Sequence, residues 1–251
     1  NARRVAGINW YHTIDLGNGL VTPGAVDCRR IASECGLPAD LTGKRVLDVG
    51  TGDGFWAFEM ERRGAAEVVA TDLDSLADYD VPRQKRDVIV DRGEETLAGV
   101  GLQPMGSGFK LAHEILGSKV KREIVNVYEL SPEKVGTFDV VFVGYLLVHL
   151  RDPQTALENI FSVARGKVVV VEPVARDLEG LDRPVSSFVG TSYLGMWWEH
   201  NTRSWELMMQ TAGFEQIEET ARAELDFSLG PDQGVTLSTV ALQGRVPHAA
   251  K

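Results

Sequence analysis

Three features of the sequence predict an α/β fold with a doubly wound, mostly parallel sheet. Short apolar runs rich in valine recur through residues 45–172, and segments with helical periodicity separate them. One of these runs ends in a glycine-rich turn that leads directly into a helix. Strands that alternate with helices form parallel sheets through right-handed crossovers. Parallel strands that are covered on both faces are apolar along their whole length, as these runs are.

Five buried strands and three helices follow from these patterns. The strands are Arg45–Val49, Glu67–Asp72, Glu123–Val127, Val140–Gly144 and Lys167–Glu172. The helices are Gly54–Arg63, Phe109–Leu116 and Asp152–Arg165. The last of them opens with an Asp-Pro pair, which is typical of a helix N-terminus.

The last part of the chain adds a helix and two strands. Arg203–Ala212 has helical periodicity, and Gly213 ends it. Phe214–Leu225 and Val235–Val246 are strands without a helix between them, so they must pair antiparallel. The predicted architecture is a seven-stranded sheet, mostly parallel with an antiparallel edge strand, in a single domain over residues 1–251.

Two stretches fit no strand or helix. Residues 74–108 form a long insertion with charge runs, glycine and proline, and residues 173–197 form a long loop. Long loops in compact domains are often functional lids. For 74–108, a lid and a solvated insertion agree equally well with the sequence.

Composition limits the class of protein and of partner. The 251 residues carry a net charge of −10, which disfavours a polyanionic substrate unless a local basic patch overrides it. No apolar run approaches the ~20 residues that cross a bilayer, so no membrane association is expected. Cys28 and Cys35 fall on a predicted helix over 25–35, where about 10 Å would separate their Cα atoms. A disulfide spans at most ~7 Å, so reduced cysteines and a cytoplasmic location are expected.

The turn after the first strand is the strongest functional signal. Residues 46–54 read VLDVGTGDG, in which an apolar strand runs into glycines at alternate positions. Glycine lets the backbone turn sharply and lets a ligand approach, while the following helix points amides at that ligand. Asp72 ends the second strand, and a carboxylate at the tip of the adjacent strand is placed to bind ribose hydroxyls. Together the two signals predict an adenosine-containing cofactor.

The spacing of the glycines distinguishes between cofactors. A pyrophosphate-binding turn has the form GxGxxG, whereas this turn reads GxGxG after an acidic strand residue, Asp48. That carboxylate would repel a pyrophosphate and attract a cation. S-adenosylmethionine carries a sulfonium and an ammonium. The segment 47–54, LDVGTGDG, resembles the first motif of the class I methyltransferases, whose sheet is Rossmann-like.

This resemblance assigns the cofactor-binding residues. It implies S-adenosylmethionine as cofactor and S-adenosylhomocysteine as product. Asp48 and the backbone of Gly50–Gly52 would hold the methionine end, Asp72 would hold the ribose, and the turn 126–129 would lie beside the adenine. The predicted cofactor set is Asp48, Gly50, Thr51, Gly52, Asp72, Leu73, Val127, Tyr128 and Gly144.

His149 is the candidate catalytic residue. The fourth strand ends at Gly144, and a short turn carries Tyr145 and His149 before a helix begins at Pro153. Ligands in open α/β sheets bind outside the carboxyl ends of the strands. A neutral imidazole there could take a proton from an acceptor hydroxyl as the methyl group leaves sulfur. Alternatively, His149 caps or packs against the following helix.

A narrower resemblance concerns three segments, 138–153 (FDVVFVGYLLVHLRDP), 10–15 (WYHTID) and 197–201 (WWEHN). They are similar to methyltransferases related to the tRNA wobble-uridine (5-hydroxyuridine) enzymes. One branch of that group transfers a carboxymethyl group and holds its carboxylate with a Tyr and an Arg, where this chain has Val148 and Leu194. The resemblance therefore implies ordinary methyl transfer. The chain also lacks the acidic ladder of metal-dependent catechol methyltransferases, so no metal is predicted.

Aromatic residues form the candidate acceptor site. The predicted set is Tyr11, His12, Tyr145, Trp197, Trp198 and His200. The cluster at 10–12 could close over the cofactor as a lid that excludes water, or it could staple the sheet edge. The residues at 197–200 could wall a planar acceptor, or pack in the core. Glu172, which ends the fifth strand, is a further carboxylate facing the cleft, and a purely structural role is its alternative.

These assignments divide the domain into a lid and helix segment (1–40), a cofactor-binding half (41–172) and a substrate-side loop with C-terminal strands (173–251). Three functions compete. O-methylation of a small hydroxylated acceptor, aromatic or a natural product, is favoured by the acidic charge and the tryptophans. A tRNA wobble-uridine methyltransferase is favoured by the narrower resemblance. A non-catalytic module that binds the cofactor is the third, and the intact glycine-rich turn argues against it. The oligomeric state is not predicted.

Overall fold

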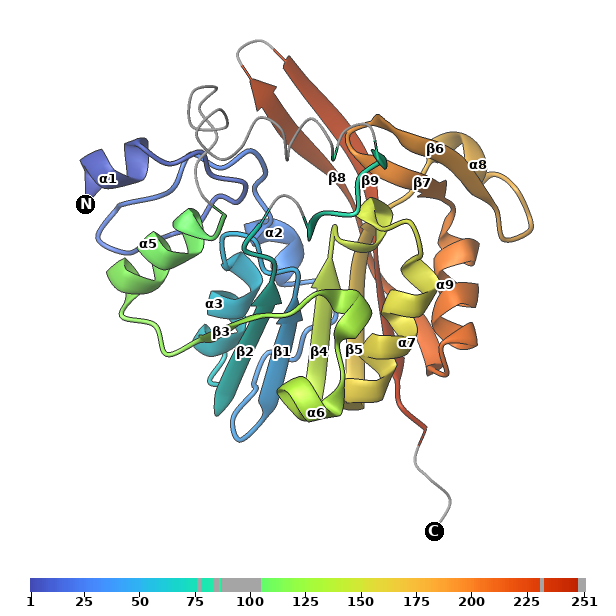
Figure 1. Cartoon of the computed structure of the whole chain (residues 1–251), viewed down its shortest axis with the longest axis horizontal. Helices are drawn as coiled ribbons and strands as arrows, with labels where there is room; N and C mark the ends of the chain where they lie inside the picture. The colour runs from blue at the N-terminus through green and yellow to red at the C-terminus, as the bar shows by residue number, and fades with distance from the viewer. Residues whose placement is uncertain (76–77, 84–85, 87–104, 231–232, 248–251) are drawn as a thin grey trace.

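The computed structural model describes residues 1–75, 78–83, 86, 105–230 and 233–247 (Figure 1). A seven-stranded sheet forms its centre, in the order β3-β2-β1-β4-β5-β9-β8. Its strands are β1 (Arg45–Val49), β2 (Glu67–Asp72), β3 (Lys121–Ile124), β4 (Phe138–Gly144), β5 (Ala164–Pro173), β8 (Glu215–Gly230) and β9 (Gln233–Arg245). The first five strands pair parallel, while β9 pairs antiparallel with β5 and with β8. The predicted seven-stranded, mostly parallel sheet is therefore confirmed, and its antiparallel strand lies between β5 and the edge strand β8.

Helices cover both faces of this sheet. They are α1 (Ala2–Ala6), α2 (Arg29–Ala32), α3 (Phe55–Arg62), α5 (Ser107–Leu116), α6 (Pro132–Val135), α7 (Pro153–Val163), α8 (Arg176–Glu179) and α9 (Thr202–Thr211), with 3-10 turns at η2 (Val127–Glu129) and η3 (Leu147–His149). Side chains of α2, α3 and α5 share one core cluster, and those of α6, α7 and α9 share the other.

Alternate residues of each central strand enter opposite cores. In β1, Val46 packs on the side of α3, whereas Leu47 packs on the side of α7. In β4, Phe142 stacks on Trp56 of α3 with 4.2 Å between ring centroids, and Val141 and Val143 face the other core. Because both faces are buried, these strands need apolar residues at every position. This requirement explains the unbroken valine runs of the sequence.

The strand order reverses between β1 and β4. The chain runs from β1 outward to β3 and then returns to β4 on the other side of β1. Such a switch point leaves a crevice outside the carboxyl ends of the two central strands, where doubly wound folds bind their ligands. The turns that follow β1 and β4 meet there, since a Cβ at Gly50 would lie 3.0 Å from the Leu146 side chain.

The stretch 173–197 is not a long loop, as the sequence suggested. It contains α8 and β6 (Ser186–Tyr193), which pairs antiparallel with β7 (Met196–His200) in a separate hairpin. Side chains from β6 and β7 meet across the hairpin, with Phe188 5.0 Å from Trp198 between ring centroids. This aromatic pairing stabilises a hairpin that the sequence pattern alone did not mark.

Two predicted elements differ from the structure in extent. The third strand covers 121–124 rather than 123–127, because Asn126 accepts a hydrogen bond from the amide of Tyr128 and starts the turn η2. The helix expected over 25–35 is only the four-residue α2. Val26 is drawn instead into β-bridges with His12 and Phe227. Both cysteines are buried and free.

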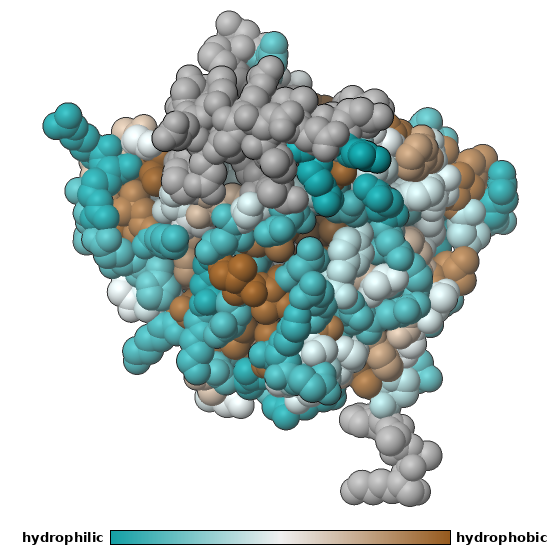
Figure 2. All heavy atoms as spheres, viewed as in Figure 1, coloured by the Kyte–Doolittle hydropathy of each residue, from teal (hydrophilic) through white to brown (hydrophobic). Residues whose placement is uncertain are grey.

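Three segments outside the parallel strands gather at the carboxyl edge of the sheet, toward the top of Figure 1. They are the N-terminal segment, the β6–β7 hairpin and the far end of the β8–β9 ribbon, which extends beyond the sheet. Figure 2 shows hydrophilic residues over much of the face that the described residues form, with hydrophobic residues in a central area and in further areas toward the left and right edges. None of the described helices combines the length and hydrophobicity that a membrane crossing requires.

Trp205 of α9 offers a test of the core packing. Its side chain is fully buried, and its indole N–H donates to the carbonyl of Pro173 at 3.1 Å. Trp205→Ala should lower the free energy of unfolding by about 3–5 kcal/mol, because it removes the largest side chain of this core and leaves a cavity. Urea unfolding measures the loss. Leu207→Ala on the same helix, at a half-exposed position, should change stability by no more than about 0.5 kcal/mol. Equal losses of unfolding free energy in the two variants would contradict the placement of Trp205 in the core.

Candidate active site

The glycine-rich turn after β1 has a backbone that only glycine adopts readily. Gly50, Gly52 and Gly54 have φ values of 75°, 56° and 92°, in the left-handed region. A Cβ at Gly54 would also overlap the Phe58 ring, so this position has no space for a side chain. The amides of Gly50 and Thr51 both donate to the carbonyl of Thr71, at 2.9 and 3.1 Å. The turn is thereby fixed to the end of β2.

Asp48 lies buried beneath this turn. One of its oxygens accepts a hydrogen bond from the Thr51 hydroxyl at 2.7 Å. Burial raises the pKa of the Asp48 carboxyl to about 7, since no basic side chain of the described residues compensates for its desolvation. A carboxylate in this state favours a cationic ligand, because a nearby positive charge stabilises its ionised form.

Asp72 stands at the rim of the same turn. Its two oxygens accept from the amides of Gly52 and Leu73, each at 2.7 Å. Burial raises the pKa of this carboxyl as well. The loop that carries it is held by Arg122 of β3, whose guanidinium donates to the carbonyl of Leu73 and to Asp74. Arg122 is a positioning residue that the sequence interpretation did not identify.

The predicted adenine-side residues lie at the end of β3, next to Asp72. The amide of Val125 donates to the carbonyl of Asp72 at 3.0 Å, and Val127 is buried in the turn that follows. The Tyr128 hydroxyl donates to Asp80 at 2.7 Å and accepts from the amide of Asp152 at 3.0 Å. The predicted cofactor residues from β1, β2 and β3 therefore share one edge of the sheet, with Gly144 on the adjacent strand β4.

Asp53 joins the N-terminal segment to the glycine-rich turn. One of its oxygens accepts from the amides of Tyr11 and His12, at 2.6 and 3.1 Å. Trp10 is buried in the core, where its indole N–H bonds the carbonyl of Val5. The structure thus divides this cluster, with Trp10 packed as a staple and its two neighbours lying over the turn. Asp53 was missed, although it is part of the motif at 47–54.

Tyr11 and Tyr145 both lie near a ring that sequence reasoning did not identify, Phe227 of β8. Ring centroids are 6.2 Å apart for Tyr11 and 5.2 Å apart for Tyr145. The Tyr145 hydroxyl bonds that of Thr239, and burial raises the pKa of both phenols. Tyr145 has a φ of 51°, a strained value for a non-glycine residue that is typical of functional sites.

Glu172 fixes the turn after β4 from below. One oxygen of its fully buried carboxyl accepts from the amides of Leu146 and Leu147, at 3.0 and 2.9 Å. The other oxygen has no hydrogen-bond partner among the described residues. Burial raises the pKa of this carboxyl to about 8. Glu172 therefore determines how the turn presents Tyr145 and His149.

His149 lies at the end of η3, beside the β6–β7 hairpin. Its Nδ1 is 3.3 Å from the carbonyl oxygen of Gly195 in the hairpin turn. Burial lowers the pKa of the imidazole, so His149 is neutral at neutral pH. A neutral imidazole whose Nδ1 donates to a carbonyl leaves Nε2 able to accept a proton. The geometry is compatible with the predicted role as a base.

The hairpin residues of the predicted acceptor set lie in two places. The indole N–H of Trp197 donates to the carbonyl of Asp80 at 2.6 Å, and that of Trp198 to the carbonyl of Arg151 at 3.0 Å. These tryptophans pack against the turn that follows His149. His200 instead is buried against Trp205, 4.1 Å between ring centroids, and its Nδ1 bonds the hydroxyls of Ser186 and Ser204. The structure therefore does not bring His200 to the turns after β1 and β4.

Asp80 connects the described part of the 74–108 insertion to this site. Its side chain accepts from the Tyr128 hydroxyl and from the amide of Arg151, at 2.7 and 2.6 Å. Its backbone carbonyl accepts from Trp197. Residues 78–83 thus cross the carboxyl edge of the sheet toward the hairpin (Figure 1). Most of 74–108 lies outside the described residues, and no periodicity marked Asp80 as structural.

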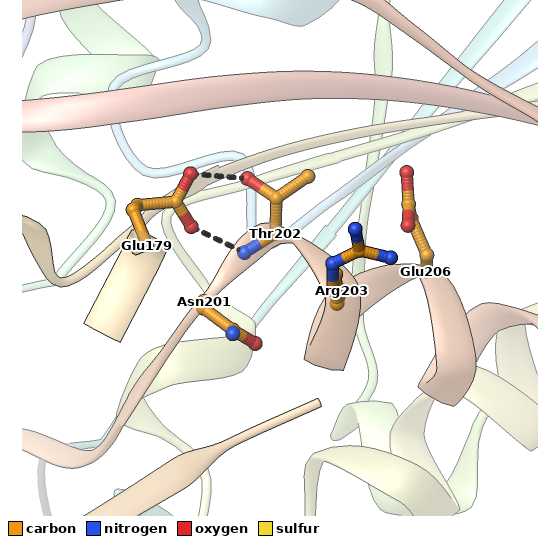
Figure 3. Close-up of a pocket in the computed structure, with 5 residues that line it drawn as sticks. All are labelled: Glu179, Asn201, Thr202, Arg203 and Glu206. Carbon is orange, nitrogen blue, oxygen red and sulfur yellow. Dashed lines mark hydrogen bonds between the residues drawn. The ribbon is translucent and has the colours of Figure 1, made fainter. Parts of the chain in front are cut away.

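A polar hollow at the N-terminus of α9 is distinct from this site (Figure 3). It is lined by Glu179, Asn201, Thr202, Arg203 and Glu206. Glu179 accepts from the amide and hydroxyl of Thr202 and pairs with Arg222. Asn201 caps the helix by accepting from the amide of Ser204. Because these groups bond one another, the hollow is explained by helix capping. No group of three or more potential metal-ligating side chains occurs within the described ranges.

The chain belongs to a known family. The family model described as "Methyltransferase domain" matches residues 26–219. Among curated proteins, the ubiquinone biosynthesis O-methyltransferase of Psychrobacter cryohalolentis is 28% identical over 155 residues, which cover 61% of this chain and 49% of that protein. The tRNA U34 carboxymethyltransferase of Ectopseudomonas mendocina is 26% identical over 181 residues, which cover 71% of this chain and 47% of that protein. The chain spans about half the length of these relatives.

Solved structures share the fold. The N-terminal domain of EvdMO1, crystallised with SAH, superposes with a TM-score of 0.60 at 17% identity, covering 98% of this chain and 95% of that chain. The magnesium protoporphyrin IX methyltransferase ChlM from Synechocystis PCC 6803 gives a TM-score of 0.50 at 16% identity, covering 83% and 77%. These likenesses confirm the Rossmann-like methyltransferase fold that the sequence predicts.

The buried carboxyl of Glu172 predicts a pH-dependent stability. The folded chain retains this proton up to about pH 8, whereas the unfolded chain releases it near pH 4.5. Stability is therefore lost as pH rises between those values. Relative to wild type, Glu172→Gln should gain up to about 1.4 kcal/mol of unfolding free energy per pH unit across this window. Urea unfolding at pH 5.5 and 7.5 measures the gain. Glu215→Gln, at an exposed position, is the control. If the gain in unfolding free energy per pH unit were the same for Glu172→Gln and Glu215→Gln, the raised pKa of Glu172 would be contradicted.

Proposed function

We propose that this methyltransferase domain binds S-adenosylmethionine and transfers its methyl group to an oxygen of a small hydroxylated acceptor. One observation carries the cofactor assignment. At the switch point of the sheet, a turn of three left-handed glycines lies between two carboxyls, Asp48 beneath it and Asp72 at its rim. No basic side chain of the described residues acts on Asp48, and Arg122, which acts on Asp72 at longer range, forms its salt bridge with Asp74.

The residues present fit the cofactor in charge and in shape. Asp48 attracts a positive charge, which supports a ligand with an ammonium and a sulfonium. Asp72 keeps accepting capacity for ribose hydroxyls, because each of its oxygens accepts only one amide. The glycines leave the backbone open to close approach. The relatives that were solved with SAH or named as methyltransferases agree with this assignment.

The proposed reaction depends on how the protein places the acceptor relative to the methyl group. S-adenosylmethionine supplies an electrophilic methyl group when it is bound, so the protein mainly has to align the acceptor with it. Positioning of this kind can contribute about 7–11 kcal/mol. Tyr11, Tyr145 and Phe227 form aromatic walls, and Glu172 holds the turn that carries Tyr145. His149 accepts the proton of the acceptor hydroxyl at Nε2 while its Nδ1 bonds Gly195.

The transferred group is a plain methyl. The carboxymethyl-transferring branch of the resembled enzymes holds the extra carboxylate with a Tyr and an Arg. Val148 is buried at the first of these positions, and Leu194 packs against the same apolar cluster at the second. Two apolar side chains provide no charge or donor for a carboxylate. Methyl transfer is therefore the reaction that these residues support.

A tRNA acceptor is the second candidate. The similarity to a tRNA U34 carboxymethyltransferase favours it, since that relative covers more of this chain than the ubiquinone enzymes do. The net charge of −10 opposes it, because a polyanion is repelled at long range. The similarity to the ubiquinone biosynthesis O-methyltransferases supports the small hydroxylated acceptor.

Removal of the Asp72 carboxylate tests the cofactor site. Asp72→Ala should weaken binding of S-adenosylhomocysteine by at least about tenfold, because hydrogen bonds to a charged group are lost. Isothermal titration calorimetry gives the dissociation constants. Asp177→Ala, at an exposed position of α8, serves as the matched control and should bind like the wild type. A wild-type protein that binds neither S-adenosylmethionine nor S-adenosylhomocysteine would overturn the proposed function.

Removal of the imidazole tests the base. Hydroxylated aromatic compounds and tRNA are first screened side by side as methyl acceptors. His149→Ala should then lower turnover by about 10²–10⁴-fold and leave S-adenosylhomocysteine binding unchanged. The deficit should shrink with more acidic phenols, because these need no base to lose their proton. A deficit that is the same for acidic and weakly acidic acceptors would assign His149 a packing role.

A further inference from the structure

His12 has a buried nitrogen without a partner beside the glycine-rich turn. The side chain is only 6% exposed, and its Nδ1 is inaccessible to solvent and forms no hydrogen bond with the part of the chain that the structure describes. A Cβ placed on Gly52 would lie 3.7 Å from the imidazole Cε1 and 3.9 Å from Nδ1. The unpartnered edge of the ring therefore lies over the turn that the proposed function assigns to the cofactor.

The imidazole is held in this position from several directions. The Asp53 carboxylate, itself part of the turn, accepts from the amide of His12. On the other side, the carbonyl of His12 accepts from the Thr22 hydroxyl at 2.6 Å. The ring stacks on Phe55, the first residue of α3, and meets Tyr11 edge to face. The ring would have to break these contacts in order to rotate toward solvent.

A buried polar atom without a partner is unfavourable, which implies a partner that is present when the protein functions. Leaving such a group unsatisfied destabilises the folded chain, because its desolvation is not compensated by a hydrogen bond. Burial lowers the pKa of His12 to about 3, so the neutral ring has one N–H donor. The ammonium of the proposed cofactor already has Asp48 as an attractive group. Its carboxylate needs a donor, and no Lys or Arg of the described chain donates a hydrogen bond to residues 50–54.

We propose that Nδ1 of His12 donates a hydrogen bond to the carboxylate at the amino-acid end of S-adenosylmethionine. His12 is then a cofactor-binding residue supplied by the N-terminal segment, rather than an acceptor-binding residue. Asp53 places it by fixing the segment to the turn. This inference rests on the proposed function, because it names a contact of that same cofactor.

Two ligands separate this role from a structural one. S-adenosylhomocysteine has the amino-acid end, whereas 5′-methylthioadenosine keeps the adenosine and the thioether and lacks that end. His12→Phe retains a ring that can stack on Phe55 but has no donor. It should weaken S-adenosylhomocysteine binding by about 10–100-fold and change 5′-methylthioadenosine binding by less than about twofold. Calorimetric titration of the full chain measures both constants.

Two conservative variants keep the inference testable if the Phe variant does not fold. The amide of asparagine places a donor at the position of Nδ1, whereas that of glutamine places it at the position of Nε2. His12→Asn should therefore keep most of the affinity for S-adenosylhomocysteine, and His12→Gln should lose it. His113→Phe on α5, whose imidazole bonds the carbonyl of Val120, is the matched control and should bind both ligands normally.

The outcomes distinguish failure of this inference from failure of the proposed function. If the wild type binds neither ligand, the proposed function fails. If the wild type binds both and His12→Phe binds S-adenosylhomocysteine equally well, His12 makes no contact with the amino-acid end. If His12→Phe loses both ligands to the same extent, or if the Asn and Gln variants are indistinguishable, His12 only supports the turn. Each of these last results overturns the inference.

Discussion

Burial of three carboxyls around one glycine-rich turn is the constraint on which the rest of this structure depends. Asp48, Asp53 and Asp72 all lie within or beside the turn, and burial raises the pKa of each. Each accepts hydrogen bonds from amides or a hydroxyl, and only Asp72 is also stabilised by a nearby cation among the described residues, Arg122. These bonds fix the turn to β2 and to the N-terminal segment at once. They also leave a negative potential that a cationic ligand would relieve, so the same groups specify the shape of the site and the charge of its ligand.

The turn after β4 follows the same principle on the neighbouring strand. Glu172 holds this turn by accepting hydrogen bonds from the amides of Leu146 and Leu147. The turn places the Leu146 side chain next to Gly50. The strained backbone of Tyr145 persists because Glu172 and Thr239 fix both of its sides. A displacement of Glu172 would therefore be transmitted both to the aromatic walls and to the glycine-rich turn. The turns after β1 and β4 are therefore coupled by direct contacts, although they come from distant parts of the chain.

The fold was predictable from the sequence because its causes are local. Valine runs identify strands that are covered on both faces, and the motif at 47–54 positions its own turn. The β6–β7 hairpin was missed because it is stabilised by aromatic contacts between its strands rather than by alternating polarity. Asp80 and Phe227 were missed because their roles depend on tertiary contacts, with Trp197 in one case and with Tyr11 and Tyr145 in the other. His200 has a sequence neighbourhood like that of the tryptophans, and only the packing against Trp205 separates it from them.

The proposed acceptor side differs from the cofactor side in its electrostatics. The phenols of Tyr11 and Tyr145, whose pKa burial raises further above its ordinary value, are uncharged at neutral pH, and so is the imidazole of His149, whose pKa burial lowers. Such groups bind by hydrogen bonding and ring contact, and they offer little compensation for a charged ligand that has lost its water. A neutral hydroxylated ring loses little hydration free energy when it binds between these side chains, and it gains both hydrogen bonds and ring contacts. A phosphate backbone would need basic groups that these walls do not include. The one basic group that contacts a described aromatic residue of the predicted acceptor set is Arg151, over the Trp197 ring, so the electrostatics of Tyr11, Tyr145 and Phe227 support the proposed small acceptor.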